Sequence, residues 1–349
     1  MSSDQPPPPQ KVPATATTAT GWAPENKEKL LRFLKEHGCE SAGYDAAHPP
    51  CATFDWDMTS IFNDIGEATF YFQVRNFALK LTLDELDALL PNKFAAEKKE
   101  TLQAFEKRDA NLFAYRMVWF YNKLEEVDGP LVAYPWLVKL YKNLLPSELA
   151  RLSERVLAHE LRKPGEKCTT IELTHATEPP IKIRHGIVDS PEMKELYSLL
   201  RLNGFDVYVV TASFQGAVQP FAMRYGVRPD HVIGMRLTVR PDGSLSDEVL
   251  EPFTYRKGKV QAIAKFVPSP PLFAAGDSDT DVEMLLQESV QLRLVLDRKK
   301  NPTSDIGKLY ERARVSDREH WMIQGRDDYG ADGTASGTWN GTTETRLDR

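Results

Sequence analysis

The sequence predicts an α/β fold in which a Rossmann-like parallel sheet is assembled from two separate pieces of the chain. After Gly186, short apolar runs alternate with helical periodicity, which is typical of a parallel sheet covered by helices. From about residue 64 to residue 160 the periodicity is helical almost throughout, and such a segment is too long for a loop. We therefore expect a core formed by residues 23–62 and 183–326, interrupted by a helical cap domain at residues 63–182.

The first piece of the core begins with a helix and a short strand. Residues 26–37 place apolar side chains at helical spacing and stop at Gly38, as a helix with a glycine C-cap does. Residues 53–56 are an apolar run that predicts a buried strand. A capping box at residues 82–85 then indicates a helix start within the insertion. Because the insertion begins just after the first strand, we expect it to form a lid over the end of that strand.

The second piece of the core supplies the remaining strands. A helix begins at Ser190, and residues 206–210 are a buried strand. Residues 241–243 form a turn between two strands of a hairpin. The elements expected around and after this turn are strands at residues 232–239 and near residues 253–255, a strand at residues 272–275, a helix at residues 280–287 and a strand at residues 292–296.

Composition excludes several classes of protein. The chain has 349 residues, a net charge of −6 and no lysine or arginine run, so it lacks the basic surface that binds nucleic acid. No stretch approaches the ~20 apolar residues of a membrane span, and three cysteines without metal-ligand spacing suggest a reducing, cytoplasmic location. The polar ends, residues 1–22 and 327–349, are expected to be disordered. A small molecule is the expected partner, and the oligomeric state stays open.

Carboxylates follow two of the predicted strands. Asp55 and Asp57 come directly after the first strand, where ligands bind in an open α/β sheet. Asp277, Asp279 and Asp281 follow a later strand and open a helix. A helix N-terminus favours one acidic side chain, but three of them beside two others repel one another unless a cation joins them. Because all the ligands are oxygens, the pattern indicates Mg²⁺.

Hydroxyl and lysine side chains complete the pattern. Thr211 and Ser213 stand at the end of the strand at residues 206–210, and Lys257 and Lys259 stand at the start of a helix. Phosphate transfer to a carboxylate needs donors for the phosphate oxygens and a cation beside the nucleophile. These residues supply both.

In this order the four groups resemble the signature motifs of the haloacid dehalogenase superfamily. The matching segments are D-x-D-x-T at residues 55–59, a hydroxyl at a strand end, a lysine, and G-D-x-x-x-D at residues 276–281. The insertion between the first two motifs is similar to that of the phosphoserine phosphatase and phosphorylcholine phosphatase branch. Departures from the usual pattern are Trp56 and Met58, which are bulky, and a threonine at position 211.

The resemblance implies a Mg²⁺-dependent phosphatase that forms an aspartyl-phosphate. Asp55 is then the nucleophile, Asp57 the general acid and base, and Lys257 the preferred catalytic lysine, with Lys259 as its substitute. The residues implied for phosphate binding are Thr59, Thr211 and Ser213. Those implied for the metal are Asp55, the backbone carbonyl of Asp57, Asp277 and Asp281, the last as ligand or as support, with the role of Asp279 left open.

The resemblance also bears on the substrate. Glu67 stands where the phosphorylcholine enzymes carry a glutamate that contacts the ammonium group, and Asp64 is its rival. Aromatic residues of the insertion could add a cage for such a cation; they are Phe70, Tyr71, Phe72, Tyr115, Trp119, Phe120, Tyr121, Tyr134 and Trp136. Phosphorylcholine, phosphoethanolamine and phosphoserine are therefore the candidate substrates. The alternatives are a phosphotransferase or mutase, and a catalytically silent binding protein on the same fold.

Overall fold

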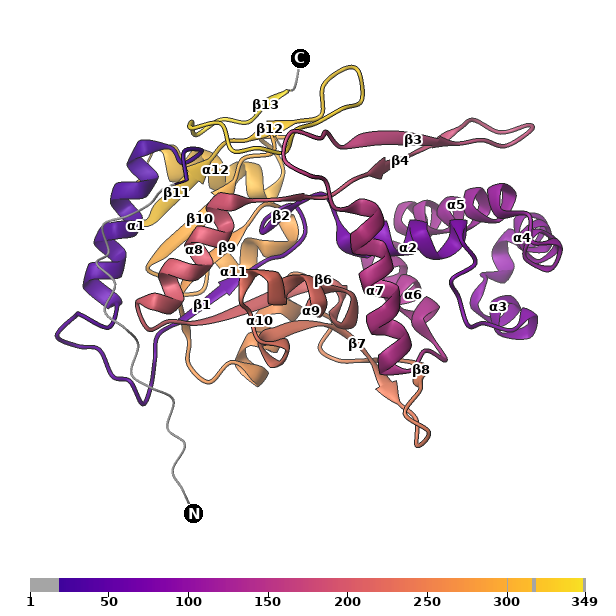
Figure 1. Cartoon of the computed structure of the whole chain (residues 1–349), viewed down its shortest axis with the longest axis horizontal. Coiled ribbons are helices and arrows are strands. Elements are labelled where there is room, and N and C mark those ends of the chain that lie inside the picture. The colour runs from indigo at the N-terminus through magenta and orange to yellow at the C-terminus, as the bar shows by residue number, and fades with distance from the viewer. Residues whose placement is uncertain (1–18, 300, 316–317, 348–349) are drawn as a thin grey trace.

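In the computed structural model, which describes residues 19–299, 301–315 and 318–347, the chain folds around a seven-stranded sheet (Figure 1). Its strands, in spatial order, are β11 (Trp321–Gln324), β10 (Leu292–Leu296), β9 (Pro271–Gly276), β1 (Cys51–Phe54), β6 (Asp206–Phe214), β7 (Val232–Val239) and β8 (Leu245–Leu250). Neighbouring strands are parallel, except that β7 and β8 form an antiparallel hairpin at one edge. This architecture confirms the predicted α/β class.

Strand β1 is central, which brings the motifs together. It pairs with β6 on one side and β9 on the other, so Phe54 stands opposite both Val209 and Ala275. The backbone N–H of Asp55 continues this ladder by donating to the carbonyl of Ala275 over 2.9 Å. Because the three strands are parallel, their carboxyl ends lie at one edge of the sheet.

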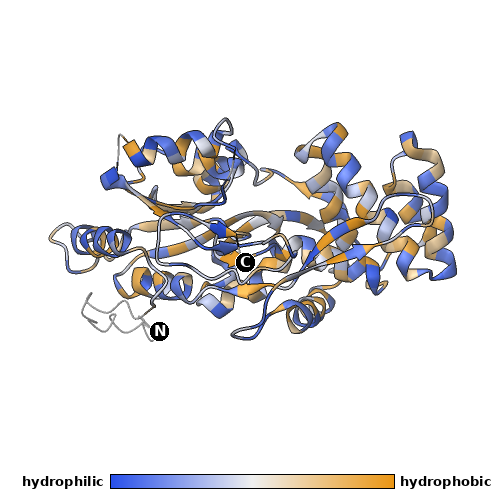
Figure 2. Cartoon of the chain, turned by 90° about the horizontal axis from the view of Figure 1, so that it is seen from above, coloured by the Kyte–Doolittle hydropathy of each residue, from blue (hydrophilic) through white to orange (hydrophobic). Residues whose placement is uncertain are grey.

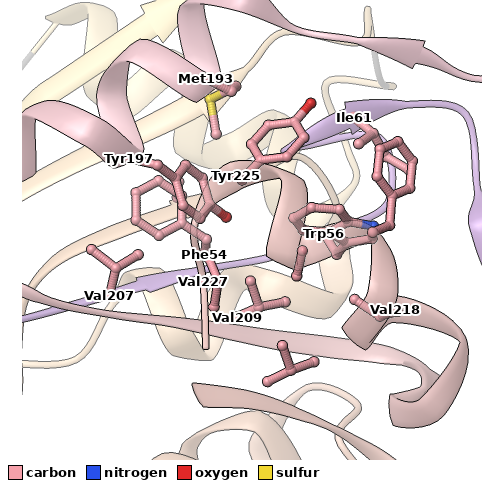
Figure 3. Close-up of a cluster of buried hydrophobic side chains, with 14 of the residues drawn as sticks. Phe54, Trp56, Ile61, Met193, Tyr197, Val207, Val209, Val218, Tyr225 and Val227 are labelled. Carbon is pink, nitrogen blue, oxygen red and sulfur yellow. The ribbon is translucent and has the colours of Figure 1, made fainter. Parts of the chain in front are cut away.

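Helices cover both faces of the sheet, because alternate strand residues face opposite sides. In β9, Phe273 and Ala275 belong to one hydrophobic core and Ala274 to another. The helices with side chains in the first core include α1 (Pro24–His37), α8 (Pro191–Leu202) and α9 (Gln215–Ala222), and those behind the other face are α10 (Lys257–Phe266), α11 (Val282–Leu285) and α12 (Asp305–Val315). Figure 3 shows part of the first core, in which the Trp56 ring packs edge-on against Tyr225. Trp56 thereby anchors the backbone between the two motif aspartates.

The inserted region, residues 65–185, lies to one side of the sheet in Figure 1. Its helices are α2 (Ile65–Arg75), α3 (Leu83–Leu89), α4 (Ala95–Lys107), α5 (Ala110–Asp128), α6 (Pro130–Val138) and α7 (Pro146–Glu160), with short 3₁₀ turns at Asn92–Phe94 and Lys139–Tyr141. An antiparallel hairpin of β3 (Thr169–Leu173) and β4 (Ile181–His185) completes it. Most of the region packs around a hydrophobic core of its own, whereas α7 and part of α2 belong to the core shared with the sheet. Hydrophilic and hydrophobic residues share its helices (Figure 2).

Two connections join the inserted region to the sheet, and they are hydrogen-bonded to each other. Strand β2 (Ile61–Phe62) leads into α2, and strand β5 (Val188–Asp189) leads out of the region. The two strands pair antiparallel, with Ile61 opposite Asp189. We call this pair the β2–β5 ribbon.

Three sequence predictions need correction. The hairpin partner of β7 is β8, ending at Leu250, and residues 253–255 are not a strand. The helix expected at residues 280–287 is a 3₁₀ turn at Asp279–Asp281 followed by the short α11. Periodicity also missed the β3–β4 hairpin, because its outward positions are polar and its strands are short.

The C-terminal segment was wrongly expected to be disordered. Strand β12 (Asp327–Asp328) pairs with β13 (Arg346–Leu347), and the Trp339 ring packs edge-on against Trp22 with centroids 4.8 Å apart. Aspartate and asparagine side chains accept hydrogen bonds from backbone N–H groups and so close the intervening turns; for example, Thr334 N–H donates to Asp332 over 3.0 Å. Trp22, inside the expected N-terminal tail, is buried too, whereas residues 1–18, 348 and 349 lie outside the described part of the chain. Within the described part, no helix combines the length and apolarity that crossing a membrane requires.

Candidate active site

A cavity of about 400 Å³ opens at the carboxyl edge of the sheet, between the strands and the inserted region. The sheet side contributes Asp55 and Asp57 after β1, Thr211 and Ser213 from β6, and Asp277 after β9. The structure therefore brings together three of the four motifs at the wall of one cavity, as the parallel topology requires. The remaining motif, at the start of α10, contributes a lysine that contacts the carboxylates at this edge of the sheet.

Three buried carboxylates form a cluster at the floor of this cavity. One oxygen from each of Asp55, Asp277 and Asp281 lies within 4.8 Å of the others. Burial raises the pKa of Asp55 well above its usual value, and the charges of Asp281 and Asp277 raise it further against the opposing charge of Lys259. For Asp277, burial would raise the pKa, but the neighbouring Arg298 guanidinium, 2.6 Å away, brings it below the usual value. We call these three residues the carboxylate cluster.

Backbone and hydroxyl donors fix the cluster. Asp281 accepts from the N–H groups of Asp277 and Ser278 at 3.0 and 3.1 Å, so it closes its own loop. The Thr59 hydroxyl lies 2.7 Å from Asp277 and 3.1 Å from Asp55. Thr59 was predicted to bind phosphate, but this position supports the carboxylates instead. Asp279 points elsewhere and accepts from Ile306 N–H at the start of α12 over 2.8 Å.

The structure brings Lys259 to the cluster and leaves Lys257, the preferred candidate, exposed. The Lys259 ammonium lies 2.5 Å from Asp55 and 2.7 Å from Asp281 and is fully buried. Both lysines belong to α10. Side chains two residues apart on a helix point in directions about 200° apart, so only one of the two lysines can face the sheet. The helix phase decides the choice, and the sequence does not reveal which face of such a short helix packs inward.

The Asp57 side chain points away from the carboxylate cluster, towards the inserted region. Its two oxygens accept from Ile65 N–H and from the Ser213 hydroxyl, each over 2.7 Å, with the Thr211 hydroxyl 3.3 Å away. Burial raises the pKa of Asp57 well above its usual value, and the charge of Asp64 adds to this against the three hydrogen bonds. A carboxyl group with a raised pKa beside a nucleophile is suited to donate a proton.

The inserted region lines the other end of the cavity. Asp64 and Glu67 line it from the start of α2, where Asp64 caps the helix by accepting from Glu67 N–H over 2.8 Å. Burial and the charge of Glu67 raise the pKa of Asp64 to about 7. Burial also raises the pKa of Glu67, although Arg184 and the Tyr71 hydroxyl oppose it. Among the described residues, neither acid is within ion-pair distance of a lysine or arginine.

Aromatic rings surround these acids. Of the nine aromatic residues considered from the sequence, Tyr121 and Tyr134 line the cavity. Two further lining residues, Glu125 and Tyr255, were missed. Tyr255 precedes α10 and lies with its ring edge-on to Tyr134, at 5.7 Å between centroids. Nothing local in the sequence marks Tyr255 or Glu125, because only the packing of the inserted region against the sheet brings them to the cavity.

Comparisons with known proteins show what the chain is similar to. The model of the haloacid dehalogenase-like hydrolase family matches residues 142–286. The phosphorylcholine phosphatase of Pseudomonas aeruginosa is 27% identical over 315 residues, which are 80% of each chain. A crystal structure of a functionally unknown protein from Anaerococcus prevotii has the same fold, with a TM-score of 0.80, 24% identity, and coverage of 95% of this chain and 100% of the other.

The match at residues 142–286 to the haloacid dehalogenase-like hydrolase family confirms the resemblance inferred from the four motifs. The predicted class of enzyme, a phosphatase, is confirmed with it.

Proposed function

We propose that this phosphatase is a Mg²⁺-dependent hydrolase of small phosphomonoesters that carry a cationic amine, and that it acts through an aspartyl-phosphate. One observation carries the proposal: a single cavity joins Asp55 and Asp57 at one end to two buried acids and tyrosine rings at the other. The first end suits a phosphoryl group and the second suits an ammonium group.

The carboxylate cluster fits a divalent cation. Its donors are all oxygens, and in the described structure its three buried carboxylates form ion pairs with Lys259 and Arg298. Hard oxygen ligands suit Mg²⁺. Asp55, Asp277 and Asp281 would hold or support the ion, and the backbone carbonyl of Asp57 stays the predicted fourth contact. Bound Mg²⁺ would offset the negative charge of the phosphoryl group and of the nucleophile.

The residues of the first end then have distinct roles. An Asp55 oxygen attacks phosphorus, and the bond from phosphorus to the ester oxygen breaks as Asp57 delivers its proton to that oxygen. Asp57, now ionised, takes a proton from the water that cleaves the aspartyl-phosphate, which releases inorganic phosphate and restores Asp55. Thr211 and Ser213 hold Asp57 and line the path of the phosphoryl oxygens. Lys259 balances the charge on Asp55 throughout.

The second end supports the choice of substrate class. Glu67 and Asp64 are buried acids with no lysine or arginine at ion-pair distance in the described structure, and the charge of Arg184 only partly offsets the cost of ionising them. A substrate ammonium group beside them would stabilise the ionised forms. A tyrosine face contributes roughly 0.5–2 kcal/mol per cation–π contact. The related protein named a phosphorylcholine phosphatase makes phosphorylcholine the first compound to examine.

The test compares phosphorylcholine with 3,3-dimethylbutyl phosphate, an uncharged ester of the same shape. We expect a higher kcat/KM for the charged ester in the parent protein, and loss of most of that preference in Glu67→Gln. Glu126→Gln is the matched control, because this exposed glutamate pairs with Lys123 outside the cavity. Equal kcat/KM values in the parent would refute the substrate class, whereas a preference that survives Glu67→Gln would transfer the role to Asp64 or to the tyrosines.

A further inference from the structure

Arg326, the last residue of the predicted core, is a buried cation behind residues 55–63, which we call the catalytic loop. Only 1% of the residue is exposed. Its Nη1 donates to the backbone carbonyl of Met58 over 2.6 Å, and its guanidinium lies over the Phe62 ring, 4.9 Å from the centroid. Within the described residues, Nε and Nη2 have no hydrogen-bond partner and no carboxylate lies at ion-pair distance. Burying a guanidinium with a single hydrogen bond and no ion pair is costly in free energy.

The partner of Arg326 is the residue between the acid Asp57 and Thr59. Met58 has φ +61°, a left-handed conformation that is uncommon for a side chain other than glycine, asparagine or aspartate. Met58 N–H donates to the carbonyl of Asn63 over 3.1 Å, which closes the loop. The carbonyl of Met58 is bound from behind by Arg326, while Thr59 contacts the carboxylate cluster in front.

The chain on both sides of Arg326 is fixed. The N–H of Arg326 donates to the Thr345 hydroxyl over 3.2 Å, and its carbonyl accepts from Arg346 N–H over 2.9 Å. At the preceding position, a Cβ in place of Gly325 would lie 2.1 Å from the carbonyl oxygen of Glu344, so this approach requires glycine. The guanidinium is thus held in place before any substrate arrives.

The charge of Arg326 also acts on the cluster. Together with the nearer Arg298, it lowers the pKa of Asp277. Burial and repulsion by Arg298 in turn lower the pKa of Arg326 to about 10, against the attraction of Asp328 and Asp277, so the side chain stays charged near pH 7. Arg326 therefore contributes little as an ion pair, because its direct polar contact is the backbone carbonyl of Met58.

We propose that Arg326 is a positioning residue: it holds the Met58 peptide in its left-handed conformation and so aims Asp57 and Thr59 on either side of it. The expected fall in kcat rests on the proposed function. The expected loosening of residues 55–63 does not depend on it. It also connects the loop that carries Asp57 to the C-terminal segment, residues 327–347, whose backbone holds Arg326 in place.

The variants for the test are Arg326→Met, which keeps packing over Phe62 but removes the donor, and Arg326→Gln, which keeps a donor without the charge. Arg346→Met is the matched control, because its exposed side chain pairs with Asp327 in the same segment. The measurements are kcat and KM for p-nitrophenyl phosphate at several Mg²⁺ concentrations, and hydrogen exchange of the backbone amides in residues 55–63. Circular dichroism and thermal unfolding show whether each variant is folded.

For Arg326→Met we expect kcat to fall about tenfold to a hundredfold, with a smaller change in KM. This range corresponds to the loss of one hydrogen bond to a charged group. Exchange in residues 55–63 should become faster, Arg326→Gln should recover part of both effects, and Arg346→Met should match the parent. A folded Arg326→Met variant with parental kcat and parental exchange would overturn the proposal. If the parent itself does not hydrolyse the ester, the proposed function fails, and the exchange data alone then decide whether Arg326 holds the loop.

Discussion

The two ends of the cavity differ in how their acidic groups are paired. At the sheet end, Asp55, Asp277 and Asp281 have lysine, arginine, hydroxyl or backbone donors at hydrogen-bond distance. At the inserted end, Asp64 and Glu67 are buried without a cationic side chain at ion-pair distance in the described structure. The first end is arranged in advance for chemistry that is common to many substrates. The second end carries negative charge that a cationic substrate can balance. Selectivity between substrates can therefore arise at this end.

The nucleophile gives the strongest test of the sheet end. We expect Asp55→Asn to lower kcat by at least about a thousandfold, because the amide keeps the shape but cannot attack phosphorus. Asp45→Asn, an exposed change of the same kind, should have no effect. Release of phosphate from p-nitrophenyl phosphate measures both. A folded Asp55→Asn protein that retains more than a few per cent of the parent rate would exclude Asp55 as the nucleophile.

The two lysines of α10 sharpen the same end. Lys259→Met should reduce kcat by about a hundredfold or more, because it removes the cation that balances Asp55. It should also lower the free energy of unfolding by about 3–5 kcal/mol, since two buried carboxylates lose their partner.

Lys257→Met is the control, because its side chain is exposed two residues away. Urea unfolding and steady-state kinetics on both variants make the comparison. Equal effects of the two substitutions would show that Lys259 is not the lysine that faces Asp55 in the active protein.

The metal requirement distinguishes the aspartates after β9. Asp277→Asn should raise the Mg²⁺ concentration for half-maximal activity at least about tenfold, because the cluster loses a charged oxygen. Asp279→Asn should not, since that side chain lies outside the cluster and asparagine can still cap α12. Activity titrated with Mg²⁺ after chelation gives both values, and a shift in Asp279→Asn alone would reverse the assignment.

The smallest effect is expected at the inserted end. Tyr134→Leu should lower kcat/KM for phosphorylcholine by about two- to thirtyfold, the range of one cation–π contact. For 3,3-dimethylbutyl phosphate the change should be slight, so the uncharged ester serves as the internal control. An equal loss with both esters would show that Tyr134 shapes the cavity rather than binding the cation.

The sequence was informative where function depends on local order along the chain. Strand ends followed by Asp55, Thr211 or Asp277 could be read directly, because parallel topology carries such positions to one edge. Lys259 and Tyr255 could not be resolved, since their roles depend on helix phase and on packing between distant regions. The C-terminal segment misled for a third reason: its turns are held by many polar side chains, so its composition resembles that of a disordered tail.

The β2–β5 ribbon brings two regions of the chain to the same proton donor. The first residue of α2, Ile65, follows the ribbon and donates its N–H to Asp57, while the Thr211 and Ser213 hydroxyls reach the same carboxylate from the sheet. The inserted region is also fixed to the sheet by a shared hydrophobic core and by backbone hydrogen bonds that join Asn143 and Leu144 to Leu245. The aim of Asp57 therefore depends on the docking of the two regions, so a substitution that loosens this interface should impair proton transfer without touching the cavity.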